Sequence, residues 1–220
     1  NIEVVKEFKL LGIFIDYKLT FATHIKQLKK AVNKKLYAIK NLFFLSYNIK
    51  LQFFKSFILP HFDYCNSIFI FLTKNLINSL ASFYNTCLFI LLKIKIKHLD
   101  LEEQQKALCK LNIFPFKYRI FYRFCLFSYK IMRGKIMKNI SSNLVRSDVT
   151  YDLRASTRNI LDVPFARTKR GSQRISIILP KVVNVVLRHS CNHEMNDFKA
   201  SILLNMNSLF AKFCDIINLK

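Results

Sequence analysis

Basic side chains, rather than acidic ones, dominate the residues that could do chemistry in this chain. No Asp or Glu lies between Asp16 and Asp63, whereas nine lysines do. A solvated helix surface usually mixes both signs, because opposite charges four residues apart stabilise a helix. One interpretation is that the phosphates of a nucleic acid supply the missing counter-charge; the alternative is drift in composition. The net charge of +23 favours a polyanionic partner, either nucleic acid or an anionic membrane surface.

A second basic cluster alternates with aromatic residues in the segment 117–123, which includes Arg119 and Arg123. Arg and Tyr together can bind phosphates and stack on bases. The alternative is a helix with a buried apolar side and solvated arginines. A third basic cluster, Arg167 to Arg174, could contact nucleic acid or act as a nuclear-import-like patch.

Carboxylates are too few and too scattered for two-metal phosphoryl transfer, which requires several acids within a few ångströms. Glu102 and Glu103 are adjacent, but they suit a helix N-terminus better than a metal site. We therefore predict no catalytic residues in this chain. The acids before residue 100 are Glu3, Glu7, Asp16 and Asp63.

Metal-capable side chains form one tight cluster, at His189, Cys191 and His193. A structural zinc site needs four ligands, usually in paired knuckles, so a surface loop is the preferred interpretation. The six cysteines form no Cys-x-x-Cys pair, and several lie in apolar runs. This pattern is typical of reduced thiols in an intracellular protein, nuclear or cytoplasmic.

Short β structure is expected first, over residues 4–15. Gly12 interrupts an apolar run, and a glycine in such a run marks a turn, a bulge or a close approach by a ligand; a buried strand with a kink is the alternative. From residue 24 to 44 apolar residues recur every three or four positions, which predicts a helix with Thr23 as its N-cap. Its apolar residues are Ile25, Leu28, Val32, Leu36, Ile39 and Phe43.

Helices are predicted over most of the chain that follows. One spans about 50–59 and is ended by Pro60; another, from Asp100 to about 111, begins with a capping box that includes Glu103; a third runs from Pro115 to Gly134. Residues 75–92 carry no charge, but several Asn and Ser make a buried core helix a better interpretation than a membrane span.

The fold class is therefore mainly α, with a short N-terminal β-hairpin and a helical bundle. We expect four parts: a hairpin over 1–22, a helical domain over 23–134, an extended basic linker over 135–174, and a helical tail over 175–220. In the tail, helical periodicity resumes at about 181–187, and one amphipathic segment covers about 197–219.

Several of these segments, in order, resemble the C-terminal part of LINE-type (non-long-terminal-repeat, jockey-like) retrotransposon reverse transcriptases. The segment Glu7 to Asp16, followed by Leu19-Thr20-Phe21 and His24-Ile25, is similar to the end of the family's palm. Residues 55–65 resemble its thumb segment, and residues 111–134 a further block. Residues that echo the tail are Arg158, Val163, Pro164, Arg167, Thr168, Gly171, Pro180, Lys181, Asn184, Phe198 and Lys199. The chain departs from the family in having no tryptophan, which suggests a drifted copy.

The resemblance implies a thumb-like domain that binds the RNA and DNA of a template–primer duplex within an RNA-directed DNA polymerase. The family's catalytic aspartates, and the Mg²⁺ that they bind, would lie upstream, in a palm and fingers domain of the same polypeptide. The hairpin would be the primer grip. The alternatives are a membrane-associated or purely structural helical protein, or a non-functional relic of a mobile element. The residues expected to contact nucleic acid are Lys9, Gly12, Lys26, Lys29, Lys30, Lys34, Arg119 and Arg123.

Overall fold

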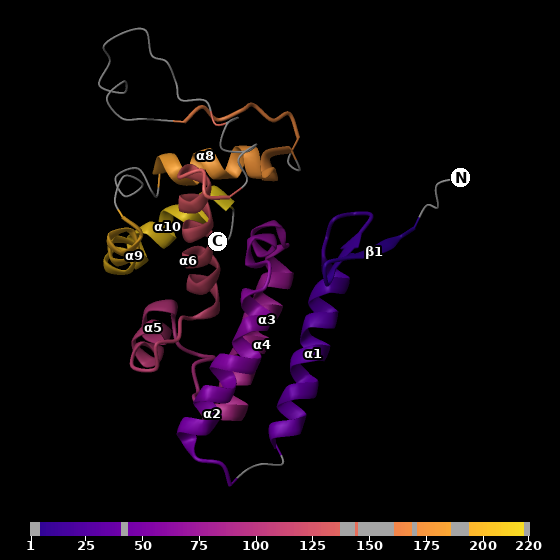
Figure 1. Cartoon of the computed structure of the whole chain (residues 1–220), viewed down its shortest axis with the longest axis vertical. Coiled ribbons are helices and arrows are strands. Elements are labelled where there is room, and N and C mark those ends of the chain that lie inside the picture. The colour runs from indigo at the N-terminus through magenta and orange to yellow at the C-terminus, as the bar shows by residue number, and fades with distance from the viewer. Residues whose placement is uncertain are drawn as a thin grey trace. The chain divides into compact units, whose positions relative to one another are not determined.

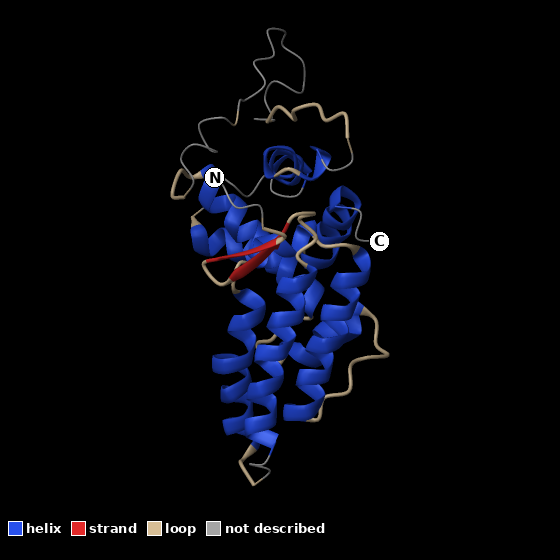
Figure 2. Ribbon diagram, turned by 90° about the vertical axis from the view of Figure 1, so that its right-hand side faces the viewer, coloured by secondary structure: helices blue, strands red, loops and turns tan. Residues whose placement is uncertain are grey.

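The structure is a computed structural model, and it describes residues 5–40, 44–136, 144, 161–168, 171–185 and 194–217. These residues are mainly helical, with one two-stranded antiparallel sheet, which confirms the predicted fold class (Figures 1 and 2). The chain divides into two compact units, residues 1–117 and 118–220, and each is described separately below. The predicted four-part division remains a prediction.

The N-terminal unit begins with the expected hairpin, formed by β1 (Glu7–Leu10) and β2 (Ile13–Asp16). Leu10 pairs with Ile13, so the turn consists of Leu11 and Gly12. Both have positive φ, 46° and 86°, as in the type I′ turns that suit the twist of a hairpin. Gly12 is therefore explained by its turn, and the strands are largely exposed, so the buried-strand interpretation is wrong.

Leu11 is a strained residue in this turn, because a left-handed conformation costs a residue with a Cβ about 1–2 kcal/mol. Its side chain is 82% exposed, so it contributes little burial in return. We expect Leu11→Asn to raise the free energy of unfolding by about 1 kcal/mol, measured by urea denaturation, because Asn tolerates this conformation and Asn-Gly favours the turn. Leu10→Asn, in the adjacent strand, is the control and should give no gain; equal effects of the two changes would contradict this explanation.

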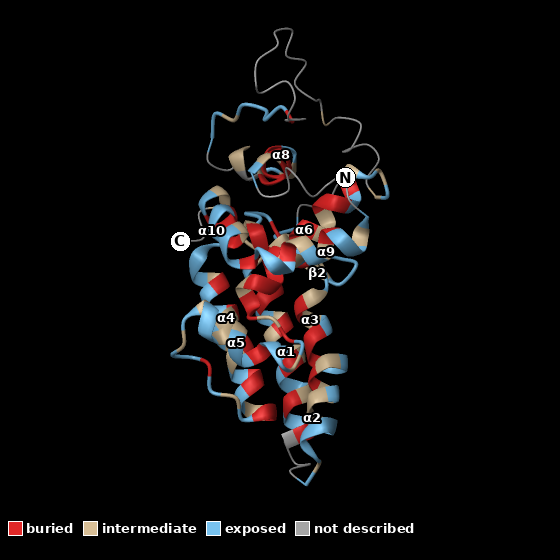
Figure 3. Ribbon diagram, turned by 90° about the vertical axis from the view of Figure 1, so that its left-hand side faces the viewer, coloured by how far each residue is buried: buried red, intermediate tan, exposed pale blue. Residues whose placement is uncertain are grey.

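Helix α1 (Ala22–Lys40) follows the hairpin, and α4 (Lys74–Leu92) packs beside it. Buried residues recur at helical spacing along both helices (Figure 3). On α1 they include the predicted Ile25, Leu28, Val32, Leu36 and Ile39; Phe43 lies outside the described residues. On α4 they are Ile77, Leu80, Tyr84, Cys87, Leu88, Leu91 and Leu92.

The next helical segment continues through Pro60, so the prediction that Pro60 ends it was wrong. Helix α2 (Tyr47–Phe53) leads into a π-helical turn, η1 (Phe54–Ile58), and then into α3 (Leu59–Asp63). In the π turn the Leu59 N–H donates to the Phe54 carbonyl, five residues back. This wider turn ends just before Pro60, which then lies in the first turn of α3, where its missing N–H is not needed.

The rest of this unit packs around a group of aromatic rings. A 3₁₀ helix, η2 (Asn66–Phe71), precedes α4, where an apolar run without assigned structure was expected. Helix α5 (Leu101–Cys109) has the predicted capping box: Asp100 accepts from the Glu103 N–H at 2.8 Å, and Glu103 accepts from the Asp100 N–H at 3.1 Å. The buried rings belong to Phe54, Phe62, Phe69, Tyr84 and Phe116.

Helix α6 (Phe116–Met132) follows Pro115, as predicted, and nearly all of it belongs to the C-terminal unit. That unit also contains a 3₁₀ turn, η4 (Gly171–Gln173), and α8 (Ile175–Val185). Helix α8 begins before Pro180 rather than after it, because five other buried apolar residues from 177 to 183 outweigh the cost of about 3 kcal/mol that a helical Pro imposes.

The final amphipathic segment is two helices, not one. Helices α9 (Met195–Leu204) and α10 (Met206–Ile217) meet at an angle of 88°. The bend lets both apolar faces pack on α6: the Phe198 ring lies 4.4 Å from that of Tyr129, and the Phe213 ring lies 5.1 Å from that of Phe121. Most of the predicted linker over 135–174 lies outside the described residues.

Candidate nucleic-acid interface

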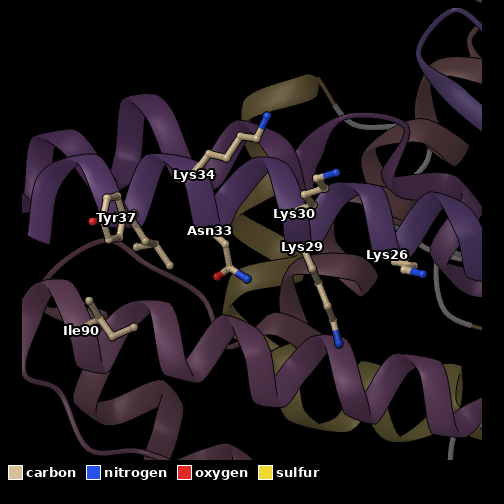
Figure 4. A pocket seen from close by; sticks show the side chains of 8 residues that line it. Lys26, Lys29, Lys30, Asn33, Lys34, Tyr37 and Ile90 are labelled. Atoms are coloured by element: carbon tan, nitrogen blue, oxygen red, sulfur yellow. The ribbon is translucent and has the colours of Figure 1, made fainter.

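Three lysines form a stripe along the exposed side of α1. Lys26, Lys30 and Lys34 are all exposed, and they are spaced four residues apart (Figure 4). An α-helix rises 1.5 Å per residue, so successive lysines of the stripe are separated by about 6 Å along the axis. The apolar residues of α1 occupy the opposite side, and this packing keeps the three ammonium groups in solvent.

A groove of about 850 Å³ runs beside the lysine stripe, in the N-terminal unit. Tyr37 and Asn33 of α1 and Ile90 of α4 contribute to its lining, together with the lysines. Tyr37 is 72% exposed, so its ring is available for stacking. Cationic heads beside an exposed aromatic ring are the combination that binds a nucleic-acid strand: the lysines hold phosphates, and the ring stacks on a base.

Lys29 is directed differently from the lysine stripe, although sequence analysis grouped it there. Its ammonium donates to Ser79 Oγ at 2.7 Å and to the Ser79 carbonyl at 3.2 Å. It also lies 5.7 Å from the centre of the Phe83 ring. Figure 4 shows the side chain reaching toward α4, whereas Lys30 and Lys34 point away from it. Lys29 therefore joins α1 to α4, and its contact with nucleic acid remains a prediction.

No acidic residue balances the lysine stripe within α1, whose sequence from Ala22 to Lys40 contains no Asp or Glu. Like charges four residues apart destabilise a helix by a few tenths of a kcal/mol per pair. The helix is stable despite this repulsion because its other face is buried against α4 and β2. A bound polyanion would remove the repulsion.

Asp16 fixes the entry into α1, a role that sequence analysis did not find. Its carboxylate accepts hydrogen bonds from the backbone N–H groups of Lys18, Thr20 and Phe21, at 3.1, 3.0 and 2.7 Å, and from the Thr20 hydroxyl at 3.0 Å. Thr23 is not the N-cap, as was predicted; it lies in the first turn and donates its hydroxyl to Glu7 Oε1 at 2.6 Å.

These hydrogen bonds make the stability of the fold depend on pH. Burial raises the pKa of Asp16, but the hydrogen bonds from Thr20, Phe21 and Lys18 together lower it by more than burial raises it. The pKa therefore lies below its ordinary value of 3.8. Stability from Asp16 is therefore present above the unfolded-state pKa and is lost as the pH falls through the folded-state pKa.

We expect Asp16→Ala to lower the free energy of unfolding by about 1–3 kcal/mol at pH 7, because it leaves the loop's N–H groups without their acceptor. Urea denaturation at several pH values measures this. Asp16→Asn keeps one oxygen acceptor and should lose less. The difference in the free energy of unfolding between wild type and Asp16→Ala should disappear as the pH falls below 3.8. A difference that stays constant with pH would contradict this role.

The hairpin presents Lys9 and Gly12 on the side that faces α1 and α3. Lys9 is exposed, and its ammonium lies 5.4 Å from the centre of the Phe14 ring. The Tyr64 hydroxyl donates to the Leu11 carbonyl, so the turn is fixed to the end of α3. A Cβ added at Gly12 would lie 3.8 Å from the Tyr64 ring, which is ordinary contact. Backbone conformation, rather than space, selects glycine here.

Arg119 and Arg123 lie in the C-terminal unit and differ in exposure. Arg119 is 7% exposed, whereas Arg123 is exposed. Tyr118 is also buried, and its hydroxyl donates to Asn207 Oδ1 at 2.9 Å. The basic and aromatic cluster of 117–123 is therefore mostly part of the core of this unit, and Arg123 is its member with an exposed side chain suited to a phosphate.

His24 is a second polar residue that sequence analysis left without a role. Its side chain is 6% exposed, and its Nδ1 atom has no hydrogen-bond partner among the described residues. Burial lowers the pKa of His24, so the imidazole is neutral at pH 7. Unpaired buried polar atoms are uncommon, which makes the surroundings of His24 a place to look for a ligand.

The part of the chain that the structure describes holds no group of three His, Cys, Asp or Glu residues that could bind a metal ion. His189, Cys191 and His193 lie outside the described residues, as do Lys169 and Arg170 of the third basic cluster. Among the described residues, Cys65, Cys87 and Cys109 are free thiols.

Comparisons with known proteins give no family for this chain: no protein-family model, no curated protein and no solved structure matches it. By length and composition, α4 is apolar enough to cross a membrane, with a mean hydropathy of 1.3 over its most apolar window. A core helix of a soluble protein passes the same test, and 39% of this window is buried. Helix α4 as a core helix remains a prediction.

Proposed function

We propose that this chain is the template–primer-binding part of an RNA-directed DNA polymerase of a retrotransposon, without catalytic residues of its own. The observation that carries the proposal is the lysine stripe of α1, exposed and without an acidic neighbour on the helix. Each ammonium that neutralises a phosphate releases a condensed counterion, and this release drives binding. Contacts of this kind hold a duplex in register without reading its sequence.

The exposed apolar face of the hairpin favours the presence of a partner domain upstream in the same polypeptide. Side chains alternate across a strand, so Phe8, Leu10, Ile13 and Ile15 share one face of the sheet. Phe8 is 58% exposed and Leu10 is 50% exposed. An uncovered apolar face on a two-stranded sheet is unusual in a stable domain. A palm domain that packs on this face would bury it and place the hairpin turn beside the primer end.

Fluorescence anisotropy with a labelled RNA–DNA duplex tests the proposal. Binding of the duplex at about 0.1 M salt is expected, and it should weaken as the salt concentration rises. Failure to bind the duplex at this salt would contradict the proposal.

A membrane-associated protein is the second candidate, because α4 is long and apolar enough to span a bilayer. Flotation with liposomes that contain anionic lipid separates the two candidates. We expect the protein to stay at the bottom of the gradient at 0.5 M salt, where electrostatic adsorption is screened. Flotation at 0.5 M salt would favour the membrane-associated protein over the nucleic-acid-binding protein.

A further inference from the structure

A second concave site lies in the N-terminal unit, between the hairpin, α1 and α3. It has a volume of about 630 Å³. Its cationic and titratable lining residues are Lys9 from the hairpin, His24 and Lys35 from α1, and His61 and Tyr64 from α3 and its C-terminal end. Among the described residues that line it, none is Asp or Glu. The lysine stripe is not part of this lining, so the two sites are separate.

Two of the lining residues, His24 and Lys35, have hydrogen-bonding capacity that the described residues do not fill. His24 is more than nine-tenths buried and lines the site, and its Nδ1 atom has no hydrogen-bond partner in the part of the chain that the structure describes. A buried polar atom without a hydrogen-bond partner is destabilising, and such atoms are uncommon in folded proteins. Lys35 already donates to the Phe57 carbonyl at 3.2 Å, and an ammonium has two further N–H donors. The groups of the site that remain available for hydrogen bonding are thus the other N–H donors of Lys35 and one imidazole nitrogen of His24.

We propose that this site binds a small phosphate-class anion, held by Lys9, Lys35 and His24. A tetrahedral oxyanion has several acceptor oxygens, and these match ammonium donors and an imidazole N–H. Charge decides the class of ligand: the two lysines would repel a cation, and an apolar ligand would leave their charges without a counter-charge. The inference goes beyond duplex binding, because it concerns a ligand that the lysine stripe does not contact.

Bound phosphate would also hold the hairpin against the helices, because Lys9 and Lys35 come from different elements. The lining also has an apolar part, which includes Phe14 and Pro60. Anion binding should favour the protonated imidazole of His24, so the pKa of His24 should rise on binding. His61, whose pKa is lowered by burial and by Lys35, should respond in the same direction.

Titration of the full chain with inorganic phosphate, followed by NMR of the histidine ring protons, tests the proposal; His24→Gln assigns the His24 signal. We expect saturable shifts of the His24 and His61 signals and a raised His24 pKa. Lys9→Gln should weaken phosphate binding at least about tenfold, as expected for the loss of one charge-assisted hydrogen bond. Lys18→Gln, which removes an exposed charge from the turn outside the site, is the matched control.

Three outcomes overturn the proposal: a linear response without saturation, equal weakening by Lys9→Gln and Lys18→Gln, or a response to an RNA–DNA duplex without any response to inorganic phosphate. The last result would assign the site to the duplex surface. A nucleoside 5′-monophosphate separates a free phosphate from a phosphate ester, and tighter binding of the ester favours a nucleotide. The variant that replaces Lys26, Lys30 and Lys34 by Gln should bind phosphate normally, so this test can fail or succeed independently of duplex binding.

Discussion

Replacing Lys26, Lys30 and Lys34 together by Gln should lower the affinity for an RNA–DNA duplex about 100- to 500-fold at 0.1 M salt. The estimate follows from counterion release. At 0.1 M salt, which is tenfold below 1 M, each phosphate contact contributes about 0.7–0.9 to the logarithm of the association constant, and three contacts are lost. The three side chains are exposed, so Gln should leave the fold intact. Fluorescence anisotropy measures the affinity, and circular dichroism checks that the variant is folded.

A matched variant separates the lysine stripe from net charge. Lys95, Lys97 and Lys106 are also exposed, belong to the same unit and lie outside α1. Their replacement by Gln removes the same three charges. We expect this variant to lose less than about tenfold in affinity, through weaker long-range attraction alone. Equal losses in the two variants would mean that the duplex is attracted by net charge and does not bind along α1.

Phe62→Ala should be the most destabilising of the single substitutions considered for the N-terminal unit. The ring is fully buried and lies 5.1 Å from the Tyr84 ring and 5.8 Å from the Phe116 ring, in both cases edge to face. Loss of a buried Phe costs about 3–5 kcal/mol, from the lost transfer free energy and the cavity left behind. Urea denaturation, followed by circular dichroism, should show a midpoint lowered accordingly.

Phe89→Ala is the control for this substitution, because Phe89 is on α4 but 42% exposed. Its loss should change the free energy of unfolding by much less than that of Phe62. Phe62→Leu keeps most of the volume and should be intermediate. A cost for Phe62→Ala no larger than that for Phe89→Ala would mean that the aromatic cluster is not the core of this unit.

Elements with a strong periodic or capping signal could be predicted from the sequence. The apolar residues of α1 fall at helical spacing, and the Asp100–Glu103 capping box is a local pattern with a local cause. The continuation of the helix through Pro60 could not be predicted, because it depends on a π turn, and no residue type in the sequence is specific for such a turn. The 88° bend between α9 and α10 was also missed, since both helices share one continuous amphipathic pattern.

The candidate interface was predictable in part. Spacing identified the lysines of α1, but only packing shows that Lys29 bonds to Ser79 while Lys26, Lys30 and Lys34 remain exposed. Asp16 and His24 were missed because their roles depend on neighbours brought together by the fold. An acid placed a few residues before a helix is a weak signal that could have pointed to Asp16.

The salt dependence of duplex binding tests the nucleic-acid proposal most directly. The logarithm of the association constant for an RNA–DNA duplex is plotted against the logarithm of the salt concentration, for the wild-type chain and for the variant lacking the lysine stripe. We expect a linear fall for the wild type, with a slope at least as steep as the roughly −2.1 to −2.7 that three phosphate contacts contribute, and a slope shallower by about that amount for the variant. A flat line for the wild type, or equal slopes for both proteins, would contradict the proposal that α1 binds the phosphates of a duplex.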